Sequence, residues 1–77
     1  KLFSILRHML TVRIYHDNKL KQEFTDQVSD ACALGYLHRV QGSSADHAIR
    51  YEGWKVELTD QETGDVEYWK PYSRINQ

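Results

Sequence analysis

The sequence predicts a single α+β domain, a two-layer sandwich in which one helix covers one side of an antiparallel sheet. Three observations predict it. The chain has 77 residues, enough for one domain with one small core. Several short segments alternate apolar and polar residues with the period of a β-strand, whereas only one longer segment carries apolar residues at helical spacing. The expected order of elements is β-β-α-β-β-β.

The first two expected strands form a hairpin. Apolar and polar residues alternate over residues 10–15, which predicts a strand with one buried face. Residues 17–19 supply a turn, in which Asn18 can adopt a positive φ. The chain then returns as a second strand over residues 20–24. The hairpin residues expected to face the core are Leu10, Val12, Ile14, Leu20 and Phe24.

A helix is expected next, over residues 26–41. Thr25 and Asp26 offer side-chain oxygens to the free N–H groups of a first helical turn. Phe24, which precedes this cap, can pack against Val28 one turn later. Cap chemistry followed by apolar residues at helical spacing therefore places the helix start at residue 26.

Two ends of this helix are compatible with the sequence. In the longer helix, Gln41 is the last residue and Gly42 closes the C-terminus. Gly35 then lies inside the helix at a cost of ~1 kcal/mol and would permit close approach to the sheet. In the shorter helix, Leu34 is the last residue, Gly35 is the cap and residues 36–40 form a strand. The longer helix is our expectation.

The C-terminal third of the chain supplies three more strands. They are expected over residues 48–51, 54–59 and 66–70. A tight turn at residues 52–53 separates the first two, and residues 61–64 form a four-residue hairpin loop that ends in glycine.

The loop length determines how the last two strands pair. With residues 61–64 in the loop, Glu57 lies opposite Tyr68. A slip by one residue would set Glu57 opposite Glu67, and two like charges at paired positions are unfavourable. The favoured register places four apolar residues on the helix side of the sheet: Trp54, Val56, Leu58 and Trp69.

The opposite side of the sheet is the candidate functional surface. Aromatic and basic side chains are expected there: Tyr15, Arg50, Lys55, Tyr68, Lys70 and Tyr72. Aromatic residues and arginine are enriched at the energetic centres of protein–protein interfaces, so this surface is expected to bind a protein partner. The alternative is an ordinary solvated sheet face, on which tyrosine rings pack against lysine stems.

No pattern in the sequence predicts catalysis, a cofactor or a metal site. Cys32 lies among apolar helix residues and is expected to be a buried, unreactive side chain. The four histidines lack the spacing of metal ligands. Ser43, Ser44, Asp46 and His47 are of the types found in catalytic triads, but proximity in sequence is not triad geometry, and a polar loop is expected. We therefore expect a protein that is not an enzyme.

Charge and composition bear on the partner and the compartment. The net charge is −1 and the isoelectric point about 6.4, unlike the strongly basic surface of a typical nucleic-acid binder. Base stacking on Tyr68 between lysines is nevertheless the main alternative function, although Glu57 and Glu67 add negative charge to the same hairpin. The single cysteine predicts a reducing, cytoplasmic location, and no apolar run reaches the length of a membrane span.

The expected domain covers residues 10–72, followed by a tail over residues 73–77. Residues 1–9 form an N-terminal extension, of which 1–8 is either a native amphipathic segment or a remnant of cloning, because His8-Met9 matches a common cloning junction. Self-association as a homodimer is a third functional interpretation. It would use exposed apolar side chains, either Leu2, Ile5, Leu6 and Met9 at helical spacing or Leu34 and Leu37.

The expected layout resembles that of small phage-encoded inhibitors, among them some anti-CRISPR proteins. The resemblance covers residues 10–70 and consists of an initial hairpin, one helix and a three-stranded meander that ends in an aromatic and basic strand. It rests on the helix start at Thr25 and Asp26, the Gly-Trp turn at residues 53–54 and the Glu-Thr-Gly hairpin at residues 62–64. It carries over no functional residues. It implies a small, rigid binder that blocks a host complex such as a CRISPR effector.

Overall fold

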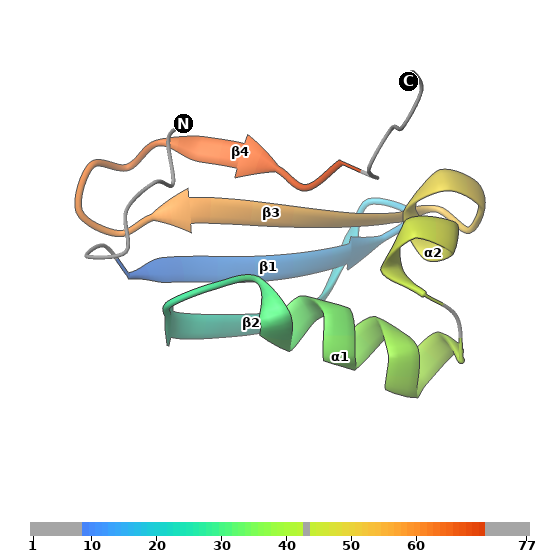
Figure 1. Ribbon diagram of the computed structural model, residues 1–77. Helices are drawn as coiled ribbons and strands as arrows, with labels where there is room; N and C mark the ends of the chain where they lie inside the picture. Colours follow the sequence, from blue (N-terminus) through green and yellow to red (C-terminus); the bar gives the residue numbers. More distant parts are fainter. Residues whose placement is uncertain (1–8, 43, 71–77) are drawn as a thin grey trace, which may run out of the picture.

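The computed structural model of the chain describes residues 9–42 and 44–70. Within them the strands form one antiparallel sheet in the order β2-β1-β3-β4, and both helices lie on the same side of it (Figure 1). This confirms the predicted α+β class. The order along the chain differs, because a second helix replaces the third expected strand. The elements are β1 (Leu10–His16), β2 (Lys19–Gln27), α1 (Ala31–Gln41), α2 (Ala45–Tyr51), β3 (Trp54–Asp60) and β4 (Val66–Tyr68).

Two tight turns lie side by side at one end of the sheet. The β1–β2 turn has positive φ at Asp17 (52°) and at Asn18 (69°), as predicted for Asn18. The second turn, at Gly53, precedes β3 and has a φ of 78°. The backbone N–H of Asp17 donates to the carbonyl of Gly53 at 3.0 Å, and a Cβ on Gly53 would lie 2.4 Å from Oδ1 of Asp17. Glycine is therefore required where the start of β3 meets the hairpin.

The expectation that Leu20 faces the core is wrong. The pair Ile14–Gln22 is followed by the pair Tyr15–Leu20, so β2 has one extra residue between them. Residues two apart on either side of such a bulge lie on opposite sides of the sheet. Leu20, before the bulge, is 53% exposed as a result, whereas Phe24, after the bulge, packs against the buried cluster as predicted.

The start of α1 also differs from the prediction. The helix begins at Ala31, and Asp26 belongs to β2, where its φ is 55°. The side-chain amide of Gln61 bonds Asp26 twice, accepting from its backbone N–H at 2.8 Å and donating to Oδ1 at 3.0 Å. This contact from a distant loop holds residue 26 in the strand, so the predicted cap does not form. Val28, expected to pack on Phe24, is 67% exposed.

The end of α1 is the longer of the two alternatives. The helix runs to Gln41, and Gly42 closes it with a φ of 71° and an N–H donated to the carbonyl of His38 at 2.9 Å. Gly35 lies inside the helix. A Cβ there would meet only Nη1 of Arg39, at 3.6 Å, an ordinary van der Waals distance. The predicted close approach of Gly35 to the sheet is therefore wrong.

Because nothing opposes a side chain at Gly35, we expect Gly35→Ala to stabilise the protein by about 1 kcal/mol, the difference in helix propensity. Thermal unfolding followed by circular dichroism should show a rise in Tm of roughly 4–8 °C. Gly42→Ala is the matched control. Its positive φ makes the same substitution unfavourable by about 1 kcal/mol, so its Tm should fall. A lower Tm for Gly35→Ala would contradict this account of α1.

The strand expected at residues 48–51 is part of α2. Ser44 caps this helix, since its Oγ accepts a hydrogen bond from the N–H of His47 at 3.2 Å. Asp46 forms an ion pair with Arg50 one turn later, at 2.7 Å. Within the described chain, these Ser, Asp and His residues thus form a helix N-terminus rather than a triad. The cap by Ser44 and the ion pair between Asp46 and Arg50 both stabilise a helix, which explains why the predicted strand does not form.

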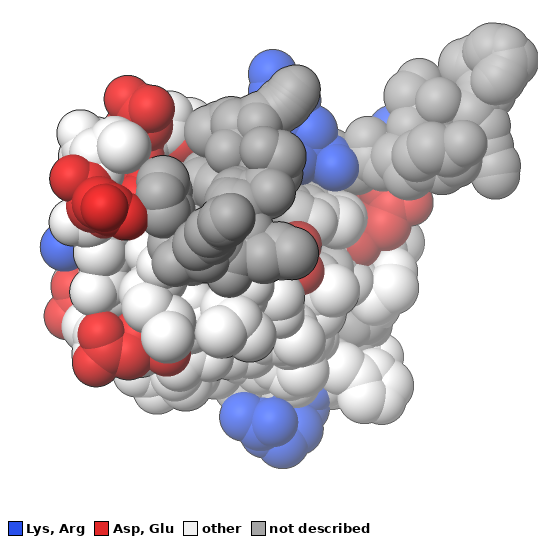
Figure 2. Space-filling view, turned by 60° about the vertical axis from the view of Figure 1, so that its left-hand side comes forward, with Lys and Arg blue, Asp and Glu red and all other residues white. Residues whose placement is uncertain are grey.

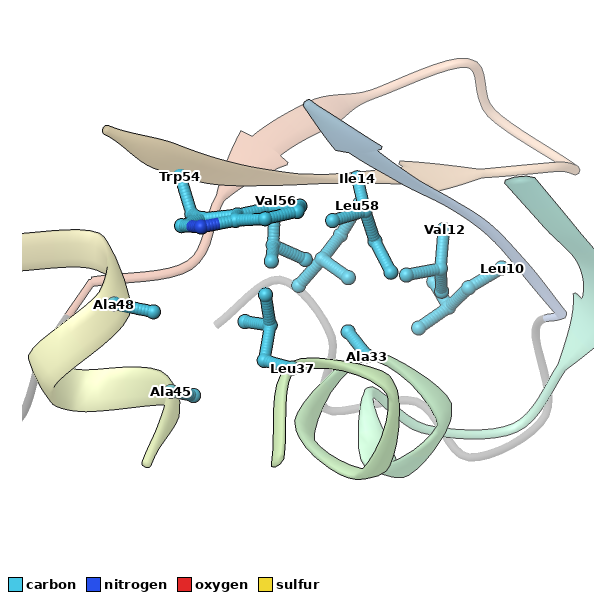
Figure 3. Close-up of a cluster of buried hydrophobic side chains, with 10 residues drawn as sticks. All are labelled: Leu10, Val12, Ile14, Ala33, Leu37, Ala45, Ala48, Trp54, Val56 and Leu58. Atoms are coloured by element: carbon cyan, nitrogen blue, oxygen red, sulfur yellow. The ribbon is translucent and has the colours of Figure 1, made fainter. Parts of the chain in front are cut away.

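The core lies between the helices and the sheet (Figure 3). Leu37 is fully buried and Leu34 packs against the core, so the apolar helix surface proposed for self-association does not exist. Leu2, Ile5 and Leu6 lie outside the described residues. No helix within the described part of the chain is long and apolar enough to cross a membrane. Among residues 9–42 and 44–70, the buried apolar side chains are Leu10, Val12, Ile14, Ala33, Leu37, Ala45, Ala48, Trp54, Val56 and Leu58.

Candidate protein-binding surface

The side of the sheet that faces away from both helices is here called the outer face (Figure 1). Its residues follow from the strand period of two, because β1 and β3 bury their even-numbered side chains in the core. Residues paired across the sheet point to the same side, which extends the outer face onto β2 and β4. The outer face comprises Thr11, Arg13, Tyr15, Leu20, Glu23, Lys55, Glu57, Thr59, Val66 and Tyr68.

Three of the predicted site residues meet at the centre of this face. Lys55 on β3 lies between Tyr15 on β1 and Tyr68 on β4. Its ammonium nitrogen is 5.3 Å from the centre of each tyrosine ring. Both distances are within the range of a cation–π interaction. The lysine therefore holds two tyrosines from different strands in one cluster.

Charged side chains beside this cluster are paired with one another. The hydroxyl of Tyr15 donates to Oε1 of Glu57 at 2.9 Å, and this hydrogen bond raises the pKa of Tyr15. Arg13 lies between two glutamates, with its Nε 2.7 Å from Glu23 and its Nη1 3.7 Å from Glu57. The hydrogen bond from Arg13 to Glu23 raises the pKa of the guanidinium further. Each of these charges is thus compensated within the face.

The β3–β4 pairing that places Tyr68 on this face is the predicted one. Glu57 lies opposite Tyr68, and the N–H of Trp69 donates to the carbonyl of Val56 at 3.0 Å. Gly64 has the expected positive φ, 83°. The side chain of Trp69 is half-buried against the core, on the helix side, as the register requires. Strand β4 itself ends at Tyr68, earlier than predicted.

A buried carboxylate shapes the loop before β4. Asp60 is the last residue of β3 and is only 3% exposed. Its Oδ1 accepts from the backbone N–H groups of Glu62 at 2.8 Å and Thr63 at 3.2 Å. Its own N–H donates to the carbonyl of Asp65 at 2.9 Å, which closes the hairpin. The loop geometry, and hence the place of Tyr68, depends on this side chain.

The other predicted site residues are not part of the cluster. Arg50 lies in α2, in the helix layer, and pairs with Asp46; its expected place on the outer face is wrong because residues 48–51 are not a strand. Lys70 is exposed and follows Trp69 just beyond the end of β4. Tyr72 lies outside the described residues.

Two exposed apolar residues of the outer face were not predicted. Leu20 is 53% exposed beside Tyr15, and Val66 is 51% exposed at the start of β4. The bulge that moves Leu20 leaves no signal in the sequence. Val66, in contrast, is two residues from Tyr68, so the strand period already placed both on one side.

No described arrangement suggests catalysis. Cys32 is half-buried against the core, and burial raises the pKa of its thiol, which lowers the fraction of reactive thiolate. Within residues 9–42 and 44–70, no group of three or more His, Cys, Asp or Glu side chains could hold a metal ion. The outer face is therefore the feature of the described structure on which a functional proposal can be built.

No protein-family model matches this chain, and comparisons with curated proteins and with solved structures found no match.

Proposed function

We propose that this protein is a non-enzymatic protein-binding module that contacts its partner through the outer face. The observation that carries the proposal is the cluster of Tyr15, Lys55 and Tyr68 on a sheet face that the helices leave uncovered. Tyrosine offers a large contact area with few rotatable bonds. Because Lys55 already holds both rings, little conformational freedom is lost when a partner binds.

Charge favours a protein over a nucleic acid as the partner. Arg13 is already engaged by Glu23 and Glu57, which leaves Lys55 as a single cation of the described outer face for phosphate groups. The side of the molecule shown in Figure 2 has Lys and Arg in separate groups, and Asp and Glu lie elsewhere on the same side. A nucleic-acid interface instead requires a continuous basic patch or stripe.

The resemblance to anti-CRISPR proteins adds a narrower prediction, that the partner is a host complex such as a CRISPR effector. The layout that suggested it is altered, because α2 stands in place of the first strand of the expected meander. A direct assay measures DNA cleavage by purified CRISPR effectors with and without the protein. Unchanged cleavage across the effector types would remove this narrower prediction without affecting the proposed binding surface. A reducing, cytoplasmic location belongs to the same proposal.

The proposal predicts that Tyr68→Ala weakens partner binding strongly and leaves folding intact. Tyr68 is 45% exposed, so its removal should change Tm little. As an interface anchor it should contribute at least about 2 kcal/mol, which corresponds to a roughly 30-fold weaker Kd. Cross-linking in the native host followed by mass spectrometry identifies the partner, and calorimetry then gives Kd.

Tyr51→Ala is the matched control for this experiment. Tyr51 is 74% exposed but lies in α2, in the helix layer. This variant should bind the partner with the wild-type Kd. Equal losses in both variants, or a Kd unaffected by Tyr68→Ala, would refute the outer face as the binding surface. Binding to nucleic acid that weakens steeply with added salt would favour the alternative function.

A further inference from the structure

We propose that the outer face binds a short acidic segment of a partner protein, and that a carboxylate of this segment pairs with the ammonium of Lys55. The inference rests on the proposed function, because it specifies the chemistry of the partner for the same surface.

Among the charged residues of the outer face, Lys55 is the one that contacts uncharged side chains and no opposite charge. Arg13 is engaged by Glu23 and Glu57, and Glu57 also accepts the hydroxyl of Tyr15. Among the described residues, no carboxylate forms an ion pair with Lys55, whose neighbours are two tyrosine rings. A ring contact leaves some of the three ammonium N–H donors unused. A bound carboxylate would complete the coordination of this cation.

The surroundings of Lys55 favour an ion pair at this point. Lys55 is exposed, so a ligand can reach its ammonium, and the tyrosine rings on two sides hold the side chain in place. The backbone N–H of Trp69 donates to the carbonyl of Val56, so hydrogen bonding between the two segments continues past the end of β4. Lys70 is the next residue and therefore lies at the same end of the sheet as Lys55. A second cation therefore lies near the site. Asp17 also lies at this end of the sheet, but its carboxylate points toward Gly53 and His16 on the helix side and not toward Lys55.

Apolar side chains surround the site on both flanks. Leu20 lies beyond Tyr15 on β2, and Val66 lies beyond Thr59 on β4. Both are about half exposed, at 53% and 51%. A segment that pairs with Lys55 can therefore bury apolar side chains to either side. The partner segment that matches this face therefore contains Asp or Glu next to aliphatic or aromatic residues.

The dimensions of the face favour a short segment over a second folded protein. From Thr59 to Lys55 the strand rises ~14 Å, and four strands are ~14 Å wide between the outer two. The face comprises ten described side chains, whereas a standard interface uses about 20–30 residues on each partner. A second copy of the chain would be held too weakly by this face alone. An extended or helical segment of a few residues matches it.

Peptide display tests the inference. A library of random ten-residue peptides is panned against the full chain, and enriched peptides are then measured by fluorescence anisotropy. We expect them to contain Asp or Glu next to apolar residues and to bind at least ten-fold more weakly to Lys55→Met. Exchange of the peptide Asp for Asn should cost the same factor. Combining both changes should cost no more than either alone, as for two groups that contact each other.

Lys19→Met is the matched control, because Lys19 is a lysine of the same sheet end that pairs with His16 on β1. It should bind the peptides like the wild type. Peptides that need Tyr68 but no acidic residue would overturn this inference and leave the proposed function standing. If no enriched peptide depends on Tyr68 or Lys55, both the inference and the proposed binding surface fail.

Discussion

Replacing Leu37 with alanine should lower the free energy of unfolding by about 2–5 kcal/mol, the largest loss among the substitutions considered. Leu37 is fully buried and points from α1 toward the sheet beneath Val56 (Figure 3). The loss combines the transfer of a large apolar side chain with the cavity left behind. Small domains are stable by only about 5–15 kcal/mol, so this variant should be close to unfolded at physiological temperature.

Urea unfolding followed by tryptophan fluorescence measures this loss. Val40→Ala is the matched control, since Val40 lies on the same helix but is 51% exposed. Its free energy of unfolding should change by less than about 0.5 kcal/mol. Comparable effects of the two substitutions would contradict the docking of α1 through Leu37. The helix surface with Leu37 exposed, considered above for self-association, would then regain support.

The parts of the fold that the sequence predicted correctly are those decided by local chemistry. Period-two alternation predicted the buried sides of β1 and β3. The loop glycine Gly64, together with repulsion between two glutamates in the slipped register, predicted the pair Glu57–Tyr68. The place of Tyr68 near Lys55 follows from these two facts, whereas the place of Tyr15 beside Lys55 also requires the pairing of β1 with β3. Neither fact depends on contacts between distant parts of the chain.

The errors arose where distant contacts override local preference. Thr25 and Asp26 have the chemistry of a helix cap, but Gln61 binds Asp26 across the sheet and keeps it in β2. Arg50 was assigned to a strand because α2 is short; the cap formed by Ser44 was the signal that could have revealed the helix. The bulge that exposes Leu20 depends on pairing between strands, which local sequence does not encode.

Asp60→Ala should be the second most damaging of the substitutions considered, with a loss of about 1–3 kcal/mol. The substitution removes the oxygen that accepts from Glu62 and Thr63, and unpaired backbone N–H groups near the core are costly. Asp60→Asn is the matched control because its amide oxygen can still accept both bonds. It should lose clearly less stability than Asp60→Ala in the same thermal unfolding assay.

The same substitution connects the fold to the proposed function. Strand β4 has three residues and, among the described strands, pairs with β3 alone, so its position depends on the loop that Asp60 shapes. Hydrogen exchange should show faster exchange of the Trp69 amide, which bonds Val56, in Asp60→Ala than in Asp60→Asn. Partner binding through Tyr68 should likewise be weaker in Asp60→Ala than in Asp60→Asn. If binding persists while this amide loses its protection, the partner does not require Tyr68 in its β4 position.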